Sequence, residues 1–296
     1  MAGMTGMQII RFRSSNDQPA LALTHNDSVI AYLPTEIQLH NLLAMRSTAL
    51  RSYLAALPTA GDDAQPGPSS LSPLAPIDGD TEVWAAGVTY RRSMDARREE
   101  SETPDIYSKV YSAQRPELFF KANPRRVSGP GQPVAIRADS TWDVPEPELA
   151  LVINRYAEIV GYTIANDMSS RSIEGENPLY LPQAKVYAAC CALGPAITMA
   201  WDLDNPYALT MHLSIERAGH IHWQGQTSTS ELKRRLDELT SYLFLQDEFP
   251  SGAILCTGTA LVPAPPFTLQ HGDIAEITID KLGTLRNPVI KGKIPS

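Results

Sequence analysis

The sequence predicts a β-rich α+β protein, with a small N-terminal α+β domain followed by a larger domain made mostly of strands. Two observations favour this fold class. From Glu82 onward, short apolar runs of strand length are separated by Pro, Gly or Asn, and few segments show helical spacing. The chain also lacks an internal repeat and the glycine patterns of Rossmann and P-loop folds, so a doubly wound parallel sheet is not expected.

The first 76 residues are expected to form the small N-terminal domain. Residues 8–14 and 28–34 are short apolar runs that predict strands, and residues 37–57 carry apolar side chains at helical spacing. Residues 58–80 are rich in Pro, Gly, Ser and Asp, a composition typical of a linker or surface loop. We therefore place the domain boundary near residue 76, with residues 77–296 forming the second domain.

The second domain is predicted to contain many strands and two clear helices. Residues 91–101 are strongly charged, with no Gly or Pro, and predict an exposed helix. Residues 230–246 predict the best-patterned helix of the chain, with leucines 232, 236, 239 and 243 on one face. The expected strands cover residues 83–88, 117–122, 133–137, 148–154, 158–167, 253–262 and 273–280.

Composition restricts the partners and the compartment. A net charge of -8 argues against nucleic acid or an anionic membrane surface as the main partner, because both need a basic face, whereas a small anionic substrate remains compatible. No apolar run is long enough to span a bilayer. Of the three cysteines, Cys190 and Cys191 are adjacent, which predicts reduced thiols and hence a cytoplasmic protein.

Three carboxylates form a candidate metal site. Glu146 and Glu148 alternate along a predicted strand and would present their carboxylates on one face, and Pro145 and Pro147 favour a sheet edge or mouth. Asp167 ends the next strand, nineteen positions later, where the chain could return beside the pair. Like charges this close are usually relieved by a cation, and an all-oxygen site suits Mg²⁺, Mn²⁺ or Ca²⁺ rather than Zn²⁺. Taken alone, the same pattern also fits the solvated face of an edge strand.

Lys185 is a second candidate functional residue. It lies among apolar and small residues in the string LPQAKVYAACCALGP, where a lysine is unusual. It could be a surface lysine whose stem covers apolar neighbours, or its ammonium could lie near the metal and act as a base toward a substrate C–H.

The motifs together resemble those of the fumarylacetoacetate hydrolase superfamily, over residues 83–290. Within that superfamily the chain is most similar to the 2-keto-3-deoxypentonate dehydratase branch, through strings such as RPELFF, PEPELALV and EGENPLYLPQAK. The resemblance implies a mixed β-roll catalytic fold, Mg²⁺ held by Glu146, Glu148 and Asp167, and a homodimer or dimer-based oligomer. The matching segments, in order, are GVTY, RPELFFK, the strand with Glu146 and Glu148, GYTIANDMSSR, LPQAK followed by LGP, ILCTGTALVP and HGDIAEITIDKLGTLRNPV.

The resemblance also implies a reaction. A 2-keto-3-deoxy sugar acid would bind the metal through its C1 carboxylate and C2 carbonyl, Lys185 would remove a C3 proton, and Glu117 would help the C4 hydroxyl leave as water. A pentonate would thus give 2,5-dioxopentanoate, a step of non-phosphorylative pentose degradation. The candidate substrate contacts are Ser93, Phe120, Lys121, Arg171 and Thr259.

Several of these residues have a structural alternative. Glu117 could be a salt-bridge partner, Arg171 could lie in a solvated loop, and Thr259 could serve turn geometry alone. Strand alternation lets only one of Phe119 and Phe120 face inward, and places Lys121 on the face of Phe119.

One departure from the superfamily separates two reactions. Its carbon–carbon hydrolases typically carry a water-activating histidine where this chain has Ser93, and no histidine lies between His40 and His212. Because serine is a poor general base near neutral pH, elimination is favoured over hydrolysis of a 2,4-dioxo acid to pyruvate. A non-catalytic protein that senses a 2-oxo acid is a further alternative, against which Lys185 and Glu117 beside the carboxylates argue.

Overall fold

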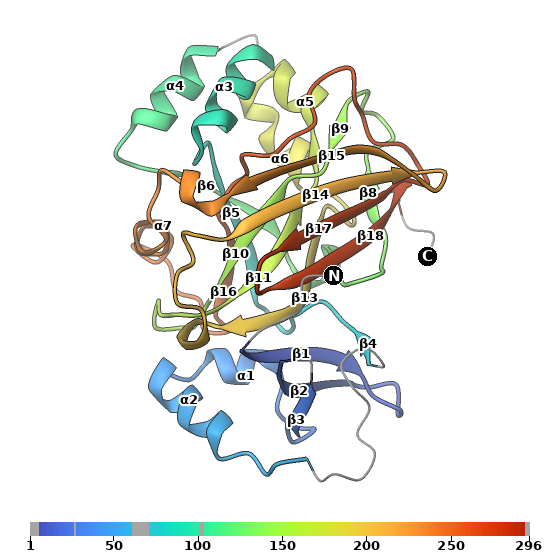
Figure 1. Ribbon diagram of the computed structural model, residues 1–296. Coiled ribbons are helices and arrows are strands. Elements are labelled where there is room, and N and C mark those ends of the chain that lie inside the picture. Colours follow the sequence, from blue (N-terminus) through green and yellow to red (C-terminus); the bar gives the residue numbers. More distant parts are fainter. Residues whose placement is uncertain (1–5, 27, 61–70, 101–103, 294–296) are drawn as a thin grey trace.

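Two β-sheets, one in front of the other, make up the body of the protein (Figure 1). The computed structural model describes residues 6–26, 28–60, 71–100 and 104–293. Helices α3, α4 and α5 gather at one end of the sheets, and the N-terminal segment lies at the opposite end (Figure 1). In the part of the chain that is described, no helix is long and apolar enough to cross a membrane.

The large sheet has the strand order β3-β2-β1-β13-β11-β10-β16-β5-β6, with β4 beside β1 and β7 beside β13. Its centre is fully buried, because every residue of β10 has negligible exposure and nearly every residue of β11 is buried as well. The strands are β1 (Met7–Arg13), β2 (Pro19–His25), β3 (Ser28–Tyr32), β4 (Ser72–Pro73), β5 (Glu82–Gly87), β6 (Glu117–Ala122), β7 (Val127–Ser128), β10 (Pro147–Ile153), β11 (Ile159–Asp167), β13 (Cys191–Met199) and β16 (Ala253–Cys256).

The second sheet, in the order β15-β14-β17-β18-β8, covers one face of the large sheet. The core between them is aliphatic and includes Leu149 and Leu151 from the large sheet and Leu213 and Ile277 from the small one. A short pair, β9 (Asp143–Val144) with β12 (Ser169–Ser170), lies apart from both sheets. The strands of the small sheet are β8 (Val134–Ile136), β14 (Thr210–Arg217), β15 (His220–Ser228), β17 (Ile274–Ile279) and β18 (Gly283–Lys291).

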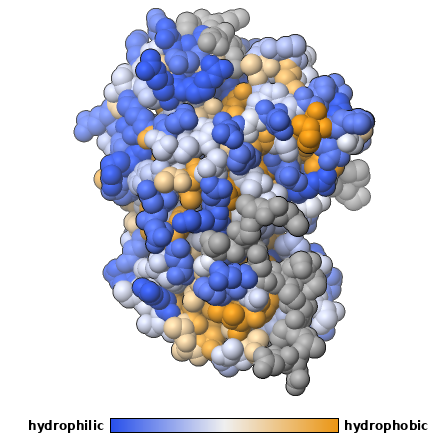
Figure 2. Space-filling view, in the orientation of Figure 1, coloured by the Kyte–Doolittle hydropathy of each residue, from blue (hydrophilic) through white to orange (hydrophobic). Residues whose placement is uncertain are grey.

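The helices are short and lie around the sheets. Hydrophilic residues cover much of the surface over α3 and α4, whereas hydrophobic residues gather over part of the N-terminal end (Figure 2). Because most of the elements are strands in two sheets, the prediction of a strand-rich α+β fold is confirmed. The helices are α1 (Leu39–Leu43), α2 (Ser47–Ala55), α3 (Arg91–Glu100), α4 (Pro104–Ser112), α5 (Arg171–Glu176), α6 (Leu181–Lys185) and α7 (Leu236–Leu243).

The N-terminal strands continue the large sheet. β1 pairs with β13 in the register Gln8 opposite Thr198, and the Gln8 amide Nε2 donates to Thr198 Oγ1 at 2.7 Å. Leucines of α1 and α2 share a core cluster with Val152, Val160 and Ile197 of the sheet. The domain boundary near residue 76 stays a prediction, and residues 61–70 of the expected linker lie outside the described part of the chain.

Two helix predictions need correction. The helix expected over residues 230–246 begins only at Leu236, because Arg234 is tied to backbone carbonyls of Val110, Ala113 and Gln114 and the chain before Leu236 is not α-helical. The helix expected over residues 91–101 forms as α3, but it is not exposed throughout.

The buried face of α3 carries an unexpected charge. Ala96 and Arg97 have only 8% of their surface exposed each, so this side of the helix faces the protein interior. The predicted strand over 253–262 also ends early, at Cys256, where the chain turns toward the site described next.

Candidate active site

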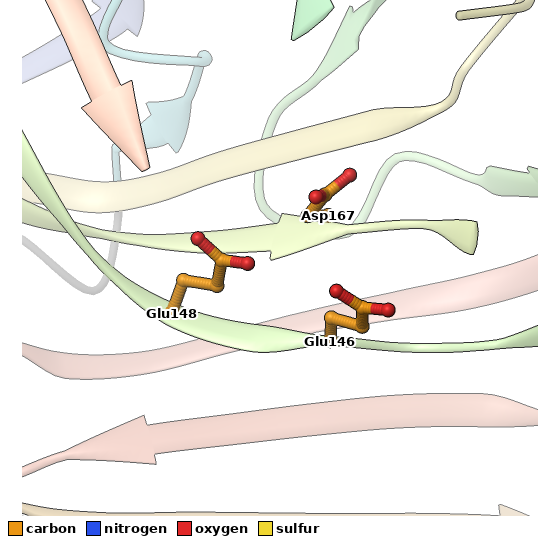
Figure 3. Close-up of side chains that lie close together, drawn as sticks. All are labelled: Glu146, Glu148 and Asp167. Atoms are coloured by element: carbon orange, nitrogen blue, oxygen red, sulfur yellow. The ribbon is translucent and has the colours of Figure 1, made fainter. Parts of the chain in front are cut away.

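Three buried carboxylates lie together where β10 and β11 run side by side. The two strands are antiparallel, with Glu148 opposite Ala165, and the Asp167 backbone N–H donates to the Glu146 carbonyl at 2.9 Å. The side chains of Glu146, Glu148 and Asp167 lie on the same side of these strands (Figure 3). One carboxylate oxygen from each lies within 4.8 Å of the other two. The expected return of the chain beside the Glu146–Glu148 pair is therefore observed.

Lys185 joins two of these carboxylates. Its Nζ donates to Glu146 Oε2 at 2.9 Å, to Asp167 Oδ2 at 2.8 Å and to Ser169 Oγ at 2.5 Å. Only 2% of the residue is exposed, so the alternative of a surface lysine is wrong. The short helix α6 ends at Lys185, which directs the side chain into the carboxylate cluster.

Lys121 approaches Asp167 from the other side. Its Nζ lies 2.5 Å from Asp167 Oδ1 and donates to the carbonyls of Met168 at 2.9 Å and Lys185 at 2.6 Å. Burial opposes the charged form of Lys121, but the neighbouring Asp167 carboxylate outweighs it and raises the lysine's pKa. Lys121 is thus a fixed cation that holds the Lys185 backbone beside Asp167.

Two arginines share the second oxygen of Glu146. Arg171 Nη2 and Arg97 Nη2 each lie 3.0 Å from Glu146 Oε1, and Arg97 also forms an ion pair with Glu174 of α5. Burial by itself would raise the pKa of Glu146, but Lys185, Arg171 and Arg97 outweigh burial and lower it. Glu146 is therefore a buried, ionised carboxylate.

Glu148 has a different environment. Its Oε2 accepts one hydrogen bond, from the Gly258 N–H at 2.6 Å. Burial and the nearby carboxylates of Asp167 and Glu146 raise the pKa of Glu148 well above its ordinary value. The positive charge of Lys185 only partly offsets this effect.

A glycine is required where the chain meets Glu148. Gly258 has φ +89°, in the left-handed region, and a Cβ there would collide with Thr89 Oγ1 and lie 3.0 Å from the Ala86 carbonyl. Thr89 in turn donates to the Thr257 carbonyl at 2.6 Å. This packing fixes the position of the Gly258 N–H, which donates to Glu148.

A narrow cavity connects the carboxylates with Glu117. Glu117 begins β6 opposite Gly87 of β5, and a Cβ on Gly87 would overlap the Glu117 carboxylate. Burial raises the pKa of Glu117, although Arg97 and Lys185 partly offset this effect. The pKa of Glu117 is thus shifted in the direction that a proton donor needs.

The structure places the other predicted site residues in three groups. Ser93 and Thr259 line the cavity, and the Thr259 hydroxyl also accepts from the Leu261 N–H at 3.1 Å. Lys121 and Arg171 contact the carboxylates behind it.

The prediction that Phe120 contacts the substrate was wrong, because this residue does not line the cavity. It faces away and packs edge-on against Trp84, with ring centroids 6.1 Å apart. Phe119 takes the inward place, with Lys185 Nζ 5.8 Å from its ring centroid. The alternation of β6 therefore puts Phe119 and Lys121 on the site face.

Sequence reasoning missed Arg97, Glu174 and the two glycines that make room for Glu117 and Glu148. A signal for Arg97 was present, because it follows Ser93 by four positions and residues four apart share a helix face. Glu174 carried no comparable signal.

Comparison with known proteins identifies the class. Residues 82–290 match the model of the family described as fumarylacetoacetate (FAA) hydrolase, C-terminal. The match covers more than half of the chain, and the chain therefore belongs to the FAA hydrolase family. The family predicted from the sequence motifs is confirmed.

Within the family, the chain is similar to sugar-acid dehydratases. It is 47% identical over 279 residues to a probable 2-keto-3-deoxyxylonate dehydratase of Haloferax volcanii, covering 94% of this chain and 95% of that protein. It is 46% identical over 220 residues to the 2-dehydro-3-deoxy-D-arabinonate dehydratase of Saccharolobus solfataricus, covering 73% of this chain and 74% of that protein.

A solved structure shares the fold. The structure of 2-keto-3-deoxy-D-arabinonate dehydratase complexed with magnesium and 2,5-dioxopentanoate superimposes with a TM-score of 0.82 at 36% identity, covering 97% of this chain and all of that one. The prediction of a fumarylacetoacetate hydrolase type of fold is therefore confirmed.

Proposed function

We propose that this protein is a Mg²⁺-dependent hydro-lyase that converts a 2-keto-3-deoxypentonate to 2,5-dioxopentanoate. The observation that carries the proposal is one cavity that contains a buried carboxylate triad, Lys185 and Glu117. The names of relatives at 46% and 47% identity, and of a solved structure with magnesium and 2,5-dioxopentanoate, support it.

Glu146, Glu148 and Asp167 would hold the metal ion. They offer hard oxygen ligands within 4.8 Å of one another, which suits Mg²⁺, with Mn²⁺ or Ca²⁺ as alternatives. The raised pKa of Glu148 reflects buried negative charge that a cation would compensate. When bound, Mg²⁺ supplies Lewis-acid polarisation of the substrate's 2-oxo group.

Lys185 is the proposed base. Lys185 lines the cavity beside the carboxylates. An ammonium cannot accept a proton, so Lys185 would first release one of its protons to solvent and then, as the neutral amine, take one proton from C3. Lys121 positions it, since Lys121 holds the Lys185 carbonyl at 2.6 Å. Lys121 itself stays protonated, because Asp167 raises its pKa.

Glu117 is the proposed acid. It lines the cavity with Lys185, and burial favours its protonated form. It would give its proton to the C4 hydroxyl as the C4–O bond breaks, so that water leaves. The C3 proton goes to Lys185, and tautomerisation of the unsaturated product gives 2,5-dioxopentanoate.

The remaining site residues would position the substrate. We assign Ser93, Thr259 and Phe119 to the cavity wall, and Lys121 and Arg171 to the support of Asp167 and Glu146. We further propose a cytoplasmic homodimer or dimer-based oligomer that takes part in pentose catabolism and binds neither nucleic acid nor membranes.

Hydrolysis of a 2,4-dioxo acid to pyruvate is the second candidate, on the same metal platform. It needs a residue that activates water. Among the described residues that line the cavity none is a histidine, and Ser93 occupies the wall where the hydrolases are expected to carry one. This composition favours elimination.

The test is a pair of reactions with purified, Mg²⁺-loaded protein, one with 2-keto-3-deoxypentonates and one with a 2,4-dioxo acid. We expect a semialdehyde from the first, lost with EDTA and restored by Mg²⁺. Pyruvate from the second, with no semialdehyde from the first, would replace the dehydratase with the hydrolase.

A further inference from the structure

Arg97 is a buried cation on the wall of the metal cavity. It lies on α3, with 8% of its surface exposed, and lines the cavity together with Glu117 and Lys185. Its Nη2 lies 3.0 Å from Glu146 Oε1, and its Nη1 pairs with Glu174. Of these acidic partners, Glu146 is a proposed metal ligand and Glu174 is not.

Arg97 competes with a metal ion for Glu146. In the described part of the chain the Glu146 carboxylate pairs with three basic side chains, since Oε1 meets Arg97 and Arg171 and Oε2 accepts from Lys185. A further positive charge at the triad would be repelled by a guanidinium this close, because burial leaves little water to screen the two charges.

Of the two arginines, Arg97 is the one placed to move. Arg171 is the first residue of α5, and its backbone N–H donates to the Trp142 carbonyl at 2.8 Å, directly after Ser170 caps the helix. Arg97 reaches Glu146 from α3 at the cavity wall, and Glu174 would still compensate its charge if it left Glu146.

We propose that Arg97 is a substrate-positioning residue that holds Glu146 while the site is empty and turns to an oxygen of the substrate's hydroxylated end when metal and substrate bind. The proposal rests on the function proposed above. Ser93, one helical turn before Arg97, lines the same cavity and adds a hydroxyl. A guanidinium fork beside a hydroxyl suits a short hydroxy acid, whose oxygens accept hydrogen bonds, better than an alkyl or aryl chain.

Two substitutions at Arg97 test the two halves of the proposal. Arg97→Met removes the charge but keeps much of the bulk, whereas Arg97→Lys keeps the charge but loses the fork. Arg217→Met is the matched control, because Arg217 also pairs with a buried carboxylate, Asp273 at 2.7 Å, but lies on the small sheet. Each protein is assayed for Mn²⁺ affinity without substrate, and for KM and kcat at saturating Mg²⁺.

We expect Arg97→Met to bind Mn²⁺ roughly three- to tenfold more tightly, because a competing charge is gone. Its KM for a 2-keto-3-deoxypentonate should rise by about tenfold or more, with a smaller change in kcat. Arg97→Lys should keep the wild-type Mn²⁺ affinity and still raise KM. Arg217→Met should change neither quantity.

Weaker or unchanged Mn²⁺ binding by Arg97→Met would overturn the proposal, because a purely structural arginine would weaken the site when lost. An unchanged KM in either variant would also overturn it. If Arg97→Met does not fold, the KM of Arg97→Lys alone tests whether Arg97 positions the substrate. Wild-type protein that forms no semialdehyde would instead overturn the proposed function and the substrate half together. The Mn²⁺ measurement would then still decide the competition for Glu146.

Discussion

At the scale of single residues, the two buried lysines, Lys121 and Lys185, differ in the groups that they contact. Lys121 donates to two backbone carbonyls and pairs with Asp167, so its contacts are part of the fold. Among the described residues, the Lys185 ammonium donates to the side chains of Glu146, Asp167 and Ser169, and both carboxylates lie on the wall of the cavity. This contrast supports our proposal that Lys185 transfers the proton and that Lys121 positions Lys185.

Replacing Lys185 by Met should abolish most of the turnover while leaving the metal bound. We expect semialdehyde formation to fall by about 10²- to 10⁴-fold, the usual contribution of a positioned base. Mn²⁺ binding should persist, because all three carboxylates remain. Lys121→Met is the matched control and should instead lower the melting temperature, since it strips buried Asp167 of a partner. Turnover of Lys185→Met within a few-fold of wild type would contradict this assignment.

The residues of the site differ in how far the sequence could predict them. Glu146 and Glu148 were predictable because strand periodicity places alternate residues on one face whatever the tertiary structure. Phe120 was wrongly chosen because alternation says that Phe119 and Phe120 point apart but not which one points inward. Arg97 was missed because a charged helix does not reveal which of its faces will be buried.

At the scale of elements, tight turns place the acids as much as the strands do. Cys256 ends β16, and the Thr257–Gly258 turn then brings a backbone N–H to Glu148. The same scale shows where periodicity fails. Residues 230–246 have the leucine spacing of one long helix, but the tertiary hydrogen bonds of Arg234 hold the chain before Leu236 out of the helix.

Gly258→Ala should weaken both the fold and the metal site. Gly219→Ala is its matched control, because Gly219 also has a positive φ, +80°, but open space around its Cβ position. We expect the control to lose about 1 kcal/mol of unfolding free energy from backbone strain alone. Gly258→Ala should lose more and bind Mn²⁺ less tightly, because its Cβ meets Thr89 and shifts the N–H from Glu148. Equal melting temperatures and Mn²⁺ affinities in the two variants would show that the turn does not position Glu148.

At the scale of the whole molecule, the order of the strands depends on pairing between segments far apart in the chain, which local sequence does not reveal. The composition of residues 58–80 predicts a break in the chain, but it does not reveal that β1 lies beside β13, with Gln8 opposite Thr198. Apolar runs predict about half of the described strands, and β2, β13, β14 and β18 were missed. The order of the strands in two sheets depends on contacts between residues far apart in sequence. The family motifs supplied that missing information.

Stability should depend on pH through Asp143, a buried carboxylate whose Oδ1 accepts no hydrogen bond from the residues that the structure describes. Burial raises its pKa to about 6 from an ordinary 3.8, so the folded state holds this proton more tightly than the unfolded state. The free energy of unfolding is therefore lowered at high pH. This loss is absent below about pH 4, grows between about pH 4 and 6, and levels off above that at an upper value of about 3 kcal/mol. Asp143→Asn should therefore raise the melting temperature at pH 7.5 but not at pH 4.

The control for that measurement is Asp273→Asn. Asp273 is as buried as Asp143 but pairs with Arg217 through two contacts, at 2.7 and 2.8 Å, so its loss should lower the melting temperature at neutral pH. A melting temperature of Asp143→Asn that matches wild type at pH 7.5 would mean that Asp143 carries no such cost.

The measurement that tests the central claim most directly is metal binding and semialdehyde formation by Glu148→Gln, side by side with Glu216→Gln on the small sheet. The substitution keeps the shape of a buried side chain and removes one of the three proposed ligand charges. We predict that Glu148→Gln loses Mg²⁺ binding and, with it, the conversion of 2-keto-3-deoxypentonate, while Glu216→Gln retains both. A Glu148→Gln protein that keeps its metal and its activity would contradict the account of this site.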